Sequence, residues 1–148
     1  MPSATRATWR DHAFEVLRAA GHRGAQARRT LVEFLDAQPC ALTAREIDDA
    51  LRARDQGIGM ASLYRNLDLL VELRLVGRLD VGQGVARYER LLPSGEHHHH
   101  LVCDRCGRVT PFDDRALEQS IERLCRRVDF QVAEHDVVLH GACSACSR

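Results

Sequence analysis

The stretch that organises this chain runs from Glu96 to Gly107 and reads EHHHHLVCDRCG. It ends in a CxxC pair, Cys103 and Cys106, and the same spacing returns near the C-terminus in Cys143 and Cys146. Thiolates at this doubled spacing are typical ligands of closed, tetrahedral zinc sites. The plainer alternative is four small buried side chains. The spacing favours zinc, and it predicts one structural site that joins two distant segments.

Four consecutive histidines, His97 to His100, precede the first pair. They are internal and lead directly into an apolar segment, so they do not have the placement of an expression tag. In an extended segment, alternate side chains project to opposite faces. His97 and His99 would then share one face, and His98 and His100 the other. One short strand could therefore supply ligands to two separate metal sites.

The length and charge of the chain limit the kinds of protein to which these sites could belong. The chain has 148 residues, of which 45% are hydrophobic and 28% charged, and this suits one medium domain or two small ones. A second small domain would need additional stabilisation, such as a bound metal ion. The formal net charge is zero, and every residue counted as Lys or Arg is arginine. Residues 1–30 hold six of them: Arg6, Arg10, Arg18, Arg23, Arg28 and Arg29. This segment suits contact with phosphates, although a solvated face is the alternative.

No secretory segment or long apolar run is present, so we expect a cytoplasmic protein. In a reducing compartment, paired CxxC motifs indicate metal binding far more often than disulfides.

The N-terminal part shows helical spacing of apolar residues over residues 9–20 and 28–35. Thr43 and Glu46 form a capping box that opens a third helix, and a fourth begins near Ser62. Strands are expected over 75–80 and 85–89, joined by a glycine-rich turn. A hairpin that follows a helix-turn-helix is the wing of a winged helix. Residues 1–90 are therefore predicted to form a DNA-binding domain.

Residues 91–96 contain Pro93 and Gly95 and are expected to act as a hinge. Beyond them we expect strands near 98–103 and 109–112, a helix over 113–127 and a strand over 130–139. Residues 97–148 would thus form a small α/β domain, which makes the predicted fold class α+β. Its exposed strand edges suit pairing across a dimer.

Four segments carry a resemblance to the Fur family of bacterial metalloregulators, and it covers nearly the whole chain. They are residues 58–67 (IGMASLYRNL), 87–89 (RYE), 97–107, and the run from His135 through Gly141-Ala142-Cys143 to Cys146. The resemblance implies a dimeric repressor whose N-terminal winged helix binds an inverted-repeat operator when metal is bound. Double-stranded DNA would be contacted by Ser62, Tyr64 and Arg65 of the fourth helix, with Arg28. Tyr64 would touch a thymine methyl, and Arg65 guanine or phosphate.

Three metal sites follow from the resemblance, residue by residue. The four cysteines match the family's structural zinc site. A second site in the dimerisation domain matches His97, His99, Glu118 and His135; a solvated helix face is the alternative for Glu118. The sensing site, which joins the two domains, matches Glu89, His98 and His100.

The sensing site departs from the family pattern in this sequence. Iron and peroxide sensors usually place a carboxylate where Pro111 stands, and zinc sensors often supply a cysteine near residues 91–93, which read Leu-Leu-Pro. Cys40 precedes the third helix, beside the position of an iron-type histidine ligand, and a thiolate favours zinc. We therefore expect Zn²⁺ as the regulatory metal, in the manner of zinc uptake regulators, with Cys40 as fourth ligand and Asp80 as a spare candidate.

The alternatives are an iron-sensing or peroxide-sensing member of the same family, with Fe²⁺ as the regulatory metal. Cys40 and Cys125 could equally be core thiols, and His12, His22 and His140 have no matching role. Outside the family, a zinc-buffering protein would share the His and Cys content but would not need a winged helix. A zinc enzyme would need an open coordination position and a general acid or base, so we do not expect an enzyme.

Overall fold

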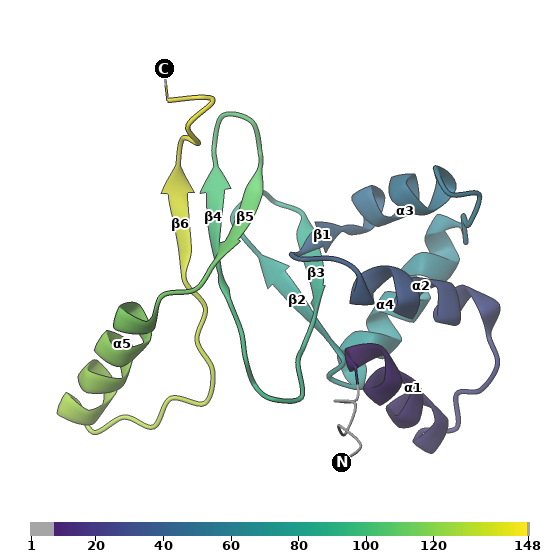
Figure 1. Cartoon of the computed structure of the whole chain (residues 1–148), viewed down its shortest axis with the longest axis horizontal. Helices are drawn as coiled ribbons and strands as arrows, with labels where there is room; N and C mark the ends of the chain where they lie inside the picture. The colour runs from purple at the N-terminus through teal and green to yellow at the C-terminus, as the bar shows by residue number, and fades with distance from the viewer. Residues whose placement is uncertain (1–7, 148) are drawn as a thin grey trace, which may run out of the picture. The chain divides into compact units, whose positions relative to one another are not determined.

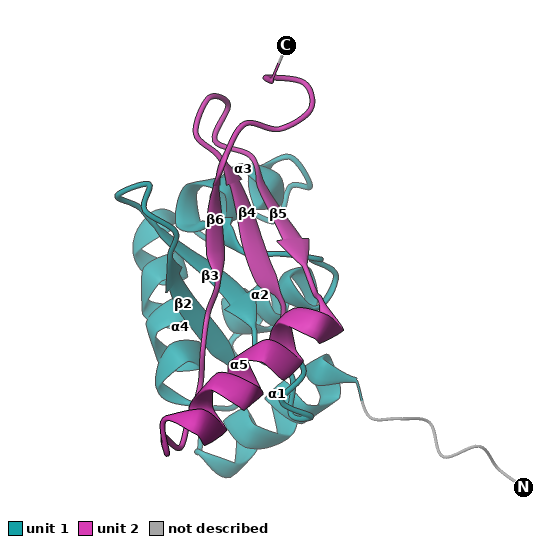
Figure 2. Cartoon of the chain, turned by 90° about the vertical axis from the view of Figure 1, so that its left-hand side faces the viewer, with its two compact units in different colours: residues 1–96 teal, residues 97–148 magenta. Residues whose placement is uncertain are grey.

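The computed structural model of this chain describes residues 8–147, and its helices and strands are labelled in Figure 1. The chain divides into two compact units, residues 1–96 and 97–148, which Figure 2 shows in teal and magenta. Each unit contains its own three-stranded sheet. Among the described helices, none combines the length and apolar character that crossing a membrane requires.

Unit 1 is a bundle of helices with a small antiparallel sheet. Its helices are α1 (Trp9–Ala19), α2 (Gln26–Asp36), α3 (Ala44–Arg52) and α4 (Met60–Glu72). Its strands are β1 (Leu42–Thr43), β2 (Val76–Asp80) and β3 (Ala86–Arg90), in the order β1-β3-β2. The predicted helices and the hairpin are confirmed. The short strand β1 was not predicted, because two residues carry no periodicity of their own.

The start of α3 is fixed locally, as the sequence predicted. The Thr43 hydroxyl accepts a hydrogen bond from the Glu46 N–H at 3.1 Å, and the Glu46 carboxylate accepts one from the Thr43 N–H at 2.8 Å. Two of the donors that a helix start leaves without an intrahelical partner are therefore satisfied reciprocally.

The core of unit 1 lies between the helices and the sheet. In α4, Leu63, Leu67 and Leu70 are fully buried, whereas Tyr64 and Arg65 point outward. Trp9 contributes its ring to the same core, and its indole N–H donates to the Leu75 carbonyl at 3.1 Å. The apolar face of α4 therefore fixes which side chains its outer face presents.

Unit 2 contains β4 (His99–Cys103), β5 (Val109–Phe112), α5 (Arg115–Arg127) and β6 (Val138–Gly141). The sheet order is β5-β4-β6, with β4 antiparallel to β5 and parallel to β6. Parallel neighbours need a crossover connection, and α5 lies within it. The Asp114 carboxylate caps α5 by accepting from the Leu117 N–H at 2.8 Å.

The last strand corrects the sequence prediction. A strand was expected over 130–139, but β6 begins only at Val138, and residues 130–137 form a loop. His135 therefore lies in a loop and not on a strand. The reason is a tertiary contact: the loop turns the His135 ring toward Glu118 of α5, and the Glu118 Oε2 lies 2.9 Å from the His135 Nε2.

Helix α5 is amphipathic, yet none of its residues is buried. Its apolar residues recur at three- and four-residue spacing in Leu117, Ile121 and Leu124, and the stripe continues to Val128 beyond the helix end. Leu124 is 47% exposed, Val128 58% and Phe130 64%. Unit 2 thus presents an apolar strip that its own described residues do not cover.

Candidate functional site

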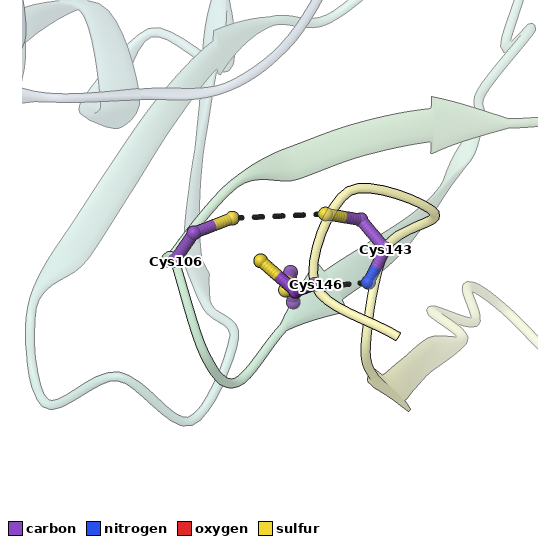
Figure 3. Close-up of side chains that lie close together, drawn as sticks. Cys106, Cys143 and Cys146 are labelled. Carbon is purple, nitrogen blue, oxygen red and sulfur yellow. Dashed lines mark hydrogen bonds between the residues drawn. The ribbon is translucent and has the colours of Figure 1, made fainter. Parts of the chain in front are cut away.

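The four cysteines of the two CxxC pairs form one cluster. One ligand atom from each lies within 4.8 Å of the others, and the Cys106 and Cys143 sulfurs are 3.9 Å apart (Figure 3). Four thiolates around Zn²⁺ at its usual bond length would be separated by about 3.8 Å. The donor set and its spacing therefore fit zinc.

Strand pairing explains why residues so far apart in sequence meet. Cys103 ends β4 and pairs in register with Gly141, the last residue of β6. Because the two strands run in the same direction, the loops that leave them start side by side. Gly107, at φ 74°, turns the first loop back so that its N–H donates to the Cys103 carbonyl at 2.8 Å.

Further hydrogen bonds join the two cysteine loops, and sequence reasoning missed them. Arg105 donates to the Cys146 carbonyl at 2.6 Å, and the Asp104 N–H donates to the Gly141 carbonyl at 2.8 Å. The Asp104 carboxylate also lies 2.9 Å from Nδ1 of His140, a residue with no predicted role. These bonds link segments that are adjacent only after β4 and β6 pair, so no local pattern signals them.

The cluster also perturbs the acidity of its thiols. The Cys143 N–H, which donates to the Cys103 sulfur at 3.3 Å, is the largest cause that lowers the pKa of Cys103 to about 6. Hydrogen bonds with the Cys143 and Cys106 thiols raise the pKa of Cys146 to about 12. Hydrogen bonds therefore stabilise one thiolate, whereas several thiolates so close together repel one another. A bound divalent cation would neutralise this repulsion.

A second group surrounds Glu118 on α5. Its Oε1 lies 2.6 Å from the His99 Nε2, and its Oε2 lies 2.9 Å from the His135 Nε2 and 3.7 Å from the His97 Nε2. The hydrogen bond from His99 is the largest cause that lowers the pKa of Glu118, and the charges of the three histidines act in the same direction. One carboxylate and three imidazoles are a donor set that suits zinc and other divalent transition metals.

The backbone of the loop before β6 holds one ring of this group. The Val137 N–H donates to Nδ1 of His99 at 3.2 Å. A neutral His99 that accepts this bond carries its proton on Nε2, the atom that faces Glu118. Metal binding through that nitrogen would therefore displace a proton, so protons and metal compete for this group.

The four residues of the predicted sensing site are divided between the two units. Within unit 1, Cys40 lies in the bend before β1 and Glu89 in β3, and one ligand atom from each lies within 4.8 Å of the other. The pairing of Leu42 with Tyr88 across β1 and β3 brings them together. Within unit 2, ligand atoms of His98 and His100 also lie within 4.8 Å. Each unit thus holds one pair of candidate ligands.

The predicted DNA contacts lie on the outer part of unit 1. Tyr64 and Arg65 are exposed on α4, while Ser62 is half-buried and accepts a hydrogen bond from the Asn66 amide. The N-cap of α4 is Gly59, whose φ of 79° suits glycine, and no side chain caps the helix start. Its first N–H groups are therefore available to an anion.

Arg28 lines a pocket of about 370 Å³ between α1 and α2. Arg18, Arg23 and Arg29 also line it, and within the described part of the chain none of these four arginines forms an ion pair. The buried Nε of Arg28 has no hydrogen-bond partner among those residues, and no side chain caps α2. The pocket therefore suits an oxyanion. Arg6 lies outside the described residues.

The remaining candidates have ordinary roles. Asp80 accepts a hydrogen bond from the Gly82 N–H at 2.9 Å and so caps the turn of the wing. Pro111 lies in β5 directly opposite His100. Cys125 lies on α5, outside each group of described residues that could hold a metal.

Comparison with known proteins gives consistent matches. The model of the ferric uptake regulator family matches residues 19–140. A ferric uptake regulation protein of Bacillus subtilis (strain 168) is 33% identical over 123 residues, which cover 82% of this chain and 83% of that protein. A peroxide-responsive repressor, PerR, of Staphylococcus epidermidis is 30% identical over 133 residues, covering 89% and 86%.

The crystal structure of the Vibrio cholerae ferric uptake regulator matches with a TM-score of 0.76 at 30% identity, covering 87% of this chain and 98% of that one. The α+β fold class predicted from the sequence, an N-terminal winged helix followed by a C-terminal α/β domain, is thereby confirmed. Since the family model spans most of the chain and two relatives are at least 30% identical over more than two thirds of it, this chain belongs to the ferric uptake regulator family of metal-responsive, DNA-binding transcriptional regulators.

Proposed function

We propose that this chain is a cytoplasmic zinc-responsive repressor that binds inverted-repeat operators as a metal-loaded homodimer and controls zinc uptake. The proposal is based on one observation, that the candidate ligands come from both units. Cys40 and Glu89 belong to unit 1, and His98 and His100 belong to unit 2. Neither pair alone completes the four-coordinate site that zinc prefers. A zinc ion held by both pairs would couple the position of the winged helix to metal binding.

The three ligand groups have different roles in this proposal. The four-cysteine group holds structural Zn²⁺, because four thiolates leave no open position and bind too tightly to follow changing metal levels. The group of His97, His99, Glu118 and His135 is a second site within unit 2. Regulation belongs to the divided group, since only that group draws ligands from both units.

Zinc is favoured over iron at the divided group for two reasons. Cys40 offers a soft thiolate, and Pro111 stands where an iron-type site has a carboxylate. The alternative is an iron-sensing regulator or a peroxide sensor with Fe²⁺. Similarity to proteins named ferric uptake regulation protein and peroxide-responsive repressor favours this alternative.

DNA recognition is assigned to α4, with Tyr64 and Arg65 at base edges and Ser62 near the backbone. Arg28 and the arginine pocket would contact a backbone phosphate. The exposure of Tyr64 and Arg65, the arginines around the pocket at Arg28 and the uncapped helix starts support this assignment.

Dimerisation is assigned to unit 2, with a second copy covering the apolar strip along α5. The exposure of Leu124, Val128 and Phe130 supports it, because burying such surface drives association.

Replacing Cys103 with serine should remove the structural zinc and unfold unit 2, because a small domain with few buried apolar side chains depends on its metal. Zinc content and the thermal unfolding midpoint of unit 2 measure the effect, with Cys125→Ser as the matched control. A Cys103→Ser protein that remains a folded dimer with an unchanged midpoint would show that the cluster is not structural.

Replacing Tyr64 and Arg65 together with alanine should abolish specific operator binding and leave the metal stoichiometry intact. Each lost base contact is expected to cost about 1–3 kcal/mol. Fluorescence anisotropy with an inverted-repeat duplex measures the affinity, and Arg126→Ala removes an exposed arginine of unit 2 as a control for charge. Equal affinities of the double variant and the parent would refute the placement of α4.

Zn²⁺ should raise operator affinity by about 5- to 150-fold, a coupling of about 1–3 kcal/mol, and operator DNA should raise metal affinity by the same factor. Anaerobic titration of operator binding with buffered Zn²⁺ and Fe²⁺ tests this in the parent, His98→Ala, His100→Ala and Cys40→Ser, with His12→Ala as the control. We expect both histidine variants to lose activation.

Activation by Fe²⁺ at concentrations where buffered Zn²⁺ has no effect would exclude zinc as the regulatory metal. Unchanged activation of both histidine variants would exclude the site itself. Unchanged activation of Cys40→Ser alone would remove only Cys40 from the ligand set.

Leu124→Glu should weaken self-association at least about tenfold, because an unpaired carboxylate would be buried against the second copy. Sedimentation equilibrium of the zinc-loaded protein measures it. Gln119→Glu adds the same charge to α5 outside the apolar strip and should leave the dimer intact. A dimer of parental strength in Leu124→Glu would place the interface elsewhere.

A further inference from the structure

The two residues that pair with His100 in the sheet both carry apolar side chains. In β5 its pairing partner is Pro111, and in β6 it is Val138. An imidazole that is to bind metal through one nitrogen is usually oriented by a hydrogen bond at the other nitrogen. The orienting group must therefore come from outside the paired positions.

Asp136 is placed to be that group. Its Oδ1 lies 3.6 Å from Nδ1 of the buried His100 ring, an ion-pair distance slightly longer than a hydrogen bond, so a small movement of the side chain would form one. It comes two residues before Val138, the β6 partner of His100, so it occupies the diagonal position next to His100 on the β6 side of β4.

The backbone next to Asp136 is held from two sides. The His100 N–H donates to the Val137 carbonyl at 3.0 Å, and the Val137 N–H donates to Nδ1 of His99 at 3.2 Å. On its other side, the His135 ring lies 2.9 Å from Glu118. Although residues 130–137 form a loop, the part that carries Asp136 is therefore fixed to β4 and α5.

We propose that Asp136 is the positioning residue for His100: its carboxylate accepts from the Nδ1–H and holds Nε2 for the regulatory metal. This rests on the proposed role of His100 as a ligand. The carboxylate would fix the tautomer and make the imidazole a stronger donor, as acidic partners of metal-bound histidines do. It would supply a carboxylate from the loop before β6, on the side of β4 opposite Pro111.

The inference also connects the two histidine groups of unit 2. His135, Asp136 and Val137 are consecutive, and they contact Glu118, His100 and His99 respectively. Displacement of this segment would therefore disturb the second group and the orientation of His100 together.

The test is a Co²⁺ titration of the dimer that retains only its structural zinc, followed by the d–d absorption of the bound ion. A Glu118→Gln background removes the carboxylate of the second group but keeps a hydrogen-bonding side chain beside His135, so that Co²⁺ reports the regulatory ligands. In that background, Asp136→Ala should bind Co²⁺ about 10- to 100-fold more weakly, while the zinc content of the four-cysteine site and the thermal midpoint stay unchanged. Asp136→Glu should recover most of the affinity. Glu134→Ala, which removes a nearby carboxylate of the same loop, should bind within about twofold of the parent.

A spectroscopic readout separates orientation from general stability. Long-range ¹H–¹⁵N spectra of the dimer with the regulatory metal removed should show the Nδ1–H tautomer of His100 in the parent and a mixture in Asp136→Ala. The inference would be overturned if Asp136→Ala bound Co²⁺ with an affinity within twofold of the parent's. It would also be overturned if the His100 tautomer were unchanged in that variant. A d–d spectrum of Asp136→Ala that indicates a lost oxygen ligand would overturn it too, because Asp136 would then bind the metal directly.

Failure of the role proposed for Asp136 can be distinguished from failure of the proposed function. If the parent shows no metal-dependent operator binding, the proposed function fails, and the Co²⁺ and tautomer measurements still decide whether Asp136 orients His100. If the parent responds to metal and Asp136→Ala matches it in affinity and tautomer, only the role of Asp136 fails.

Discussion

The parallel pairing of β4 with β6 is the constraint on which unit 2 depends. His100 pairs with Val138 at one end of the ladder, and Cys103 with Gly141 at the other. At the carboxyl ends of the strands, this register brings together two cysteine loops that lie about 40 residues apart in the chain. At the amino ends it sets residues 135–137 beside His99 and His100. Both ends of one short ladder therefore carry side chains that could bind metal.

Unit 2 has little else to hold it together. Its described buried residues are His99, His100, Val102 and Cys103, and its helix buries none. The fraction of its surface that a chain buries on folding falls as the domain becomes smaller, so a domain of about 50 residues gains limited stability from apolar burial alone. Metal ligation and association with a second copy can both supply what the core lacks. This accounts for the coexistence of many ligands and an uncovered apolar strip in the same unit.

Unit 1 is organised differently, around an apolar core that includes residues of all four helices. The segment Arg87–Glu89 shows how the wing is tied to that core. Arg87 is buried and pairs with the Glu46 carboxylate at 3.0 Å, the same carboxylate that caps α3. Tyr88 packs into the core, and the next residue, Glu89, is one of the candidate ligands. Core packing on one side of β3 thus sets the position of a proposed metal ligand.

Local sequence patterns were sufficient to predict much of this structure. The apolar spacing of the helices, the capping box at Thr43 and the doubled CxxC motif act within a few residues or through a spacing typical of one metal, so the sequence alone predicts them. The sequence also indicated that His97 and His99 belong with Glu118 and His135, through its resemblance to a family.

Other features were decided only by the tertiary structure. Strand β1, the late start of β6, the loop position of His135 and the contact between Asp136 and His100 all depend on which strand pairs with which, and in what register. Register is set by the packing of side chains that are distant in sequence, and a shift of one residue reverses which face each side chain occupies. No window of this sequence contains that information, because the pairing partners of β4 lie on either side of α5.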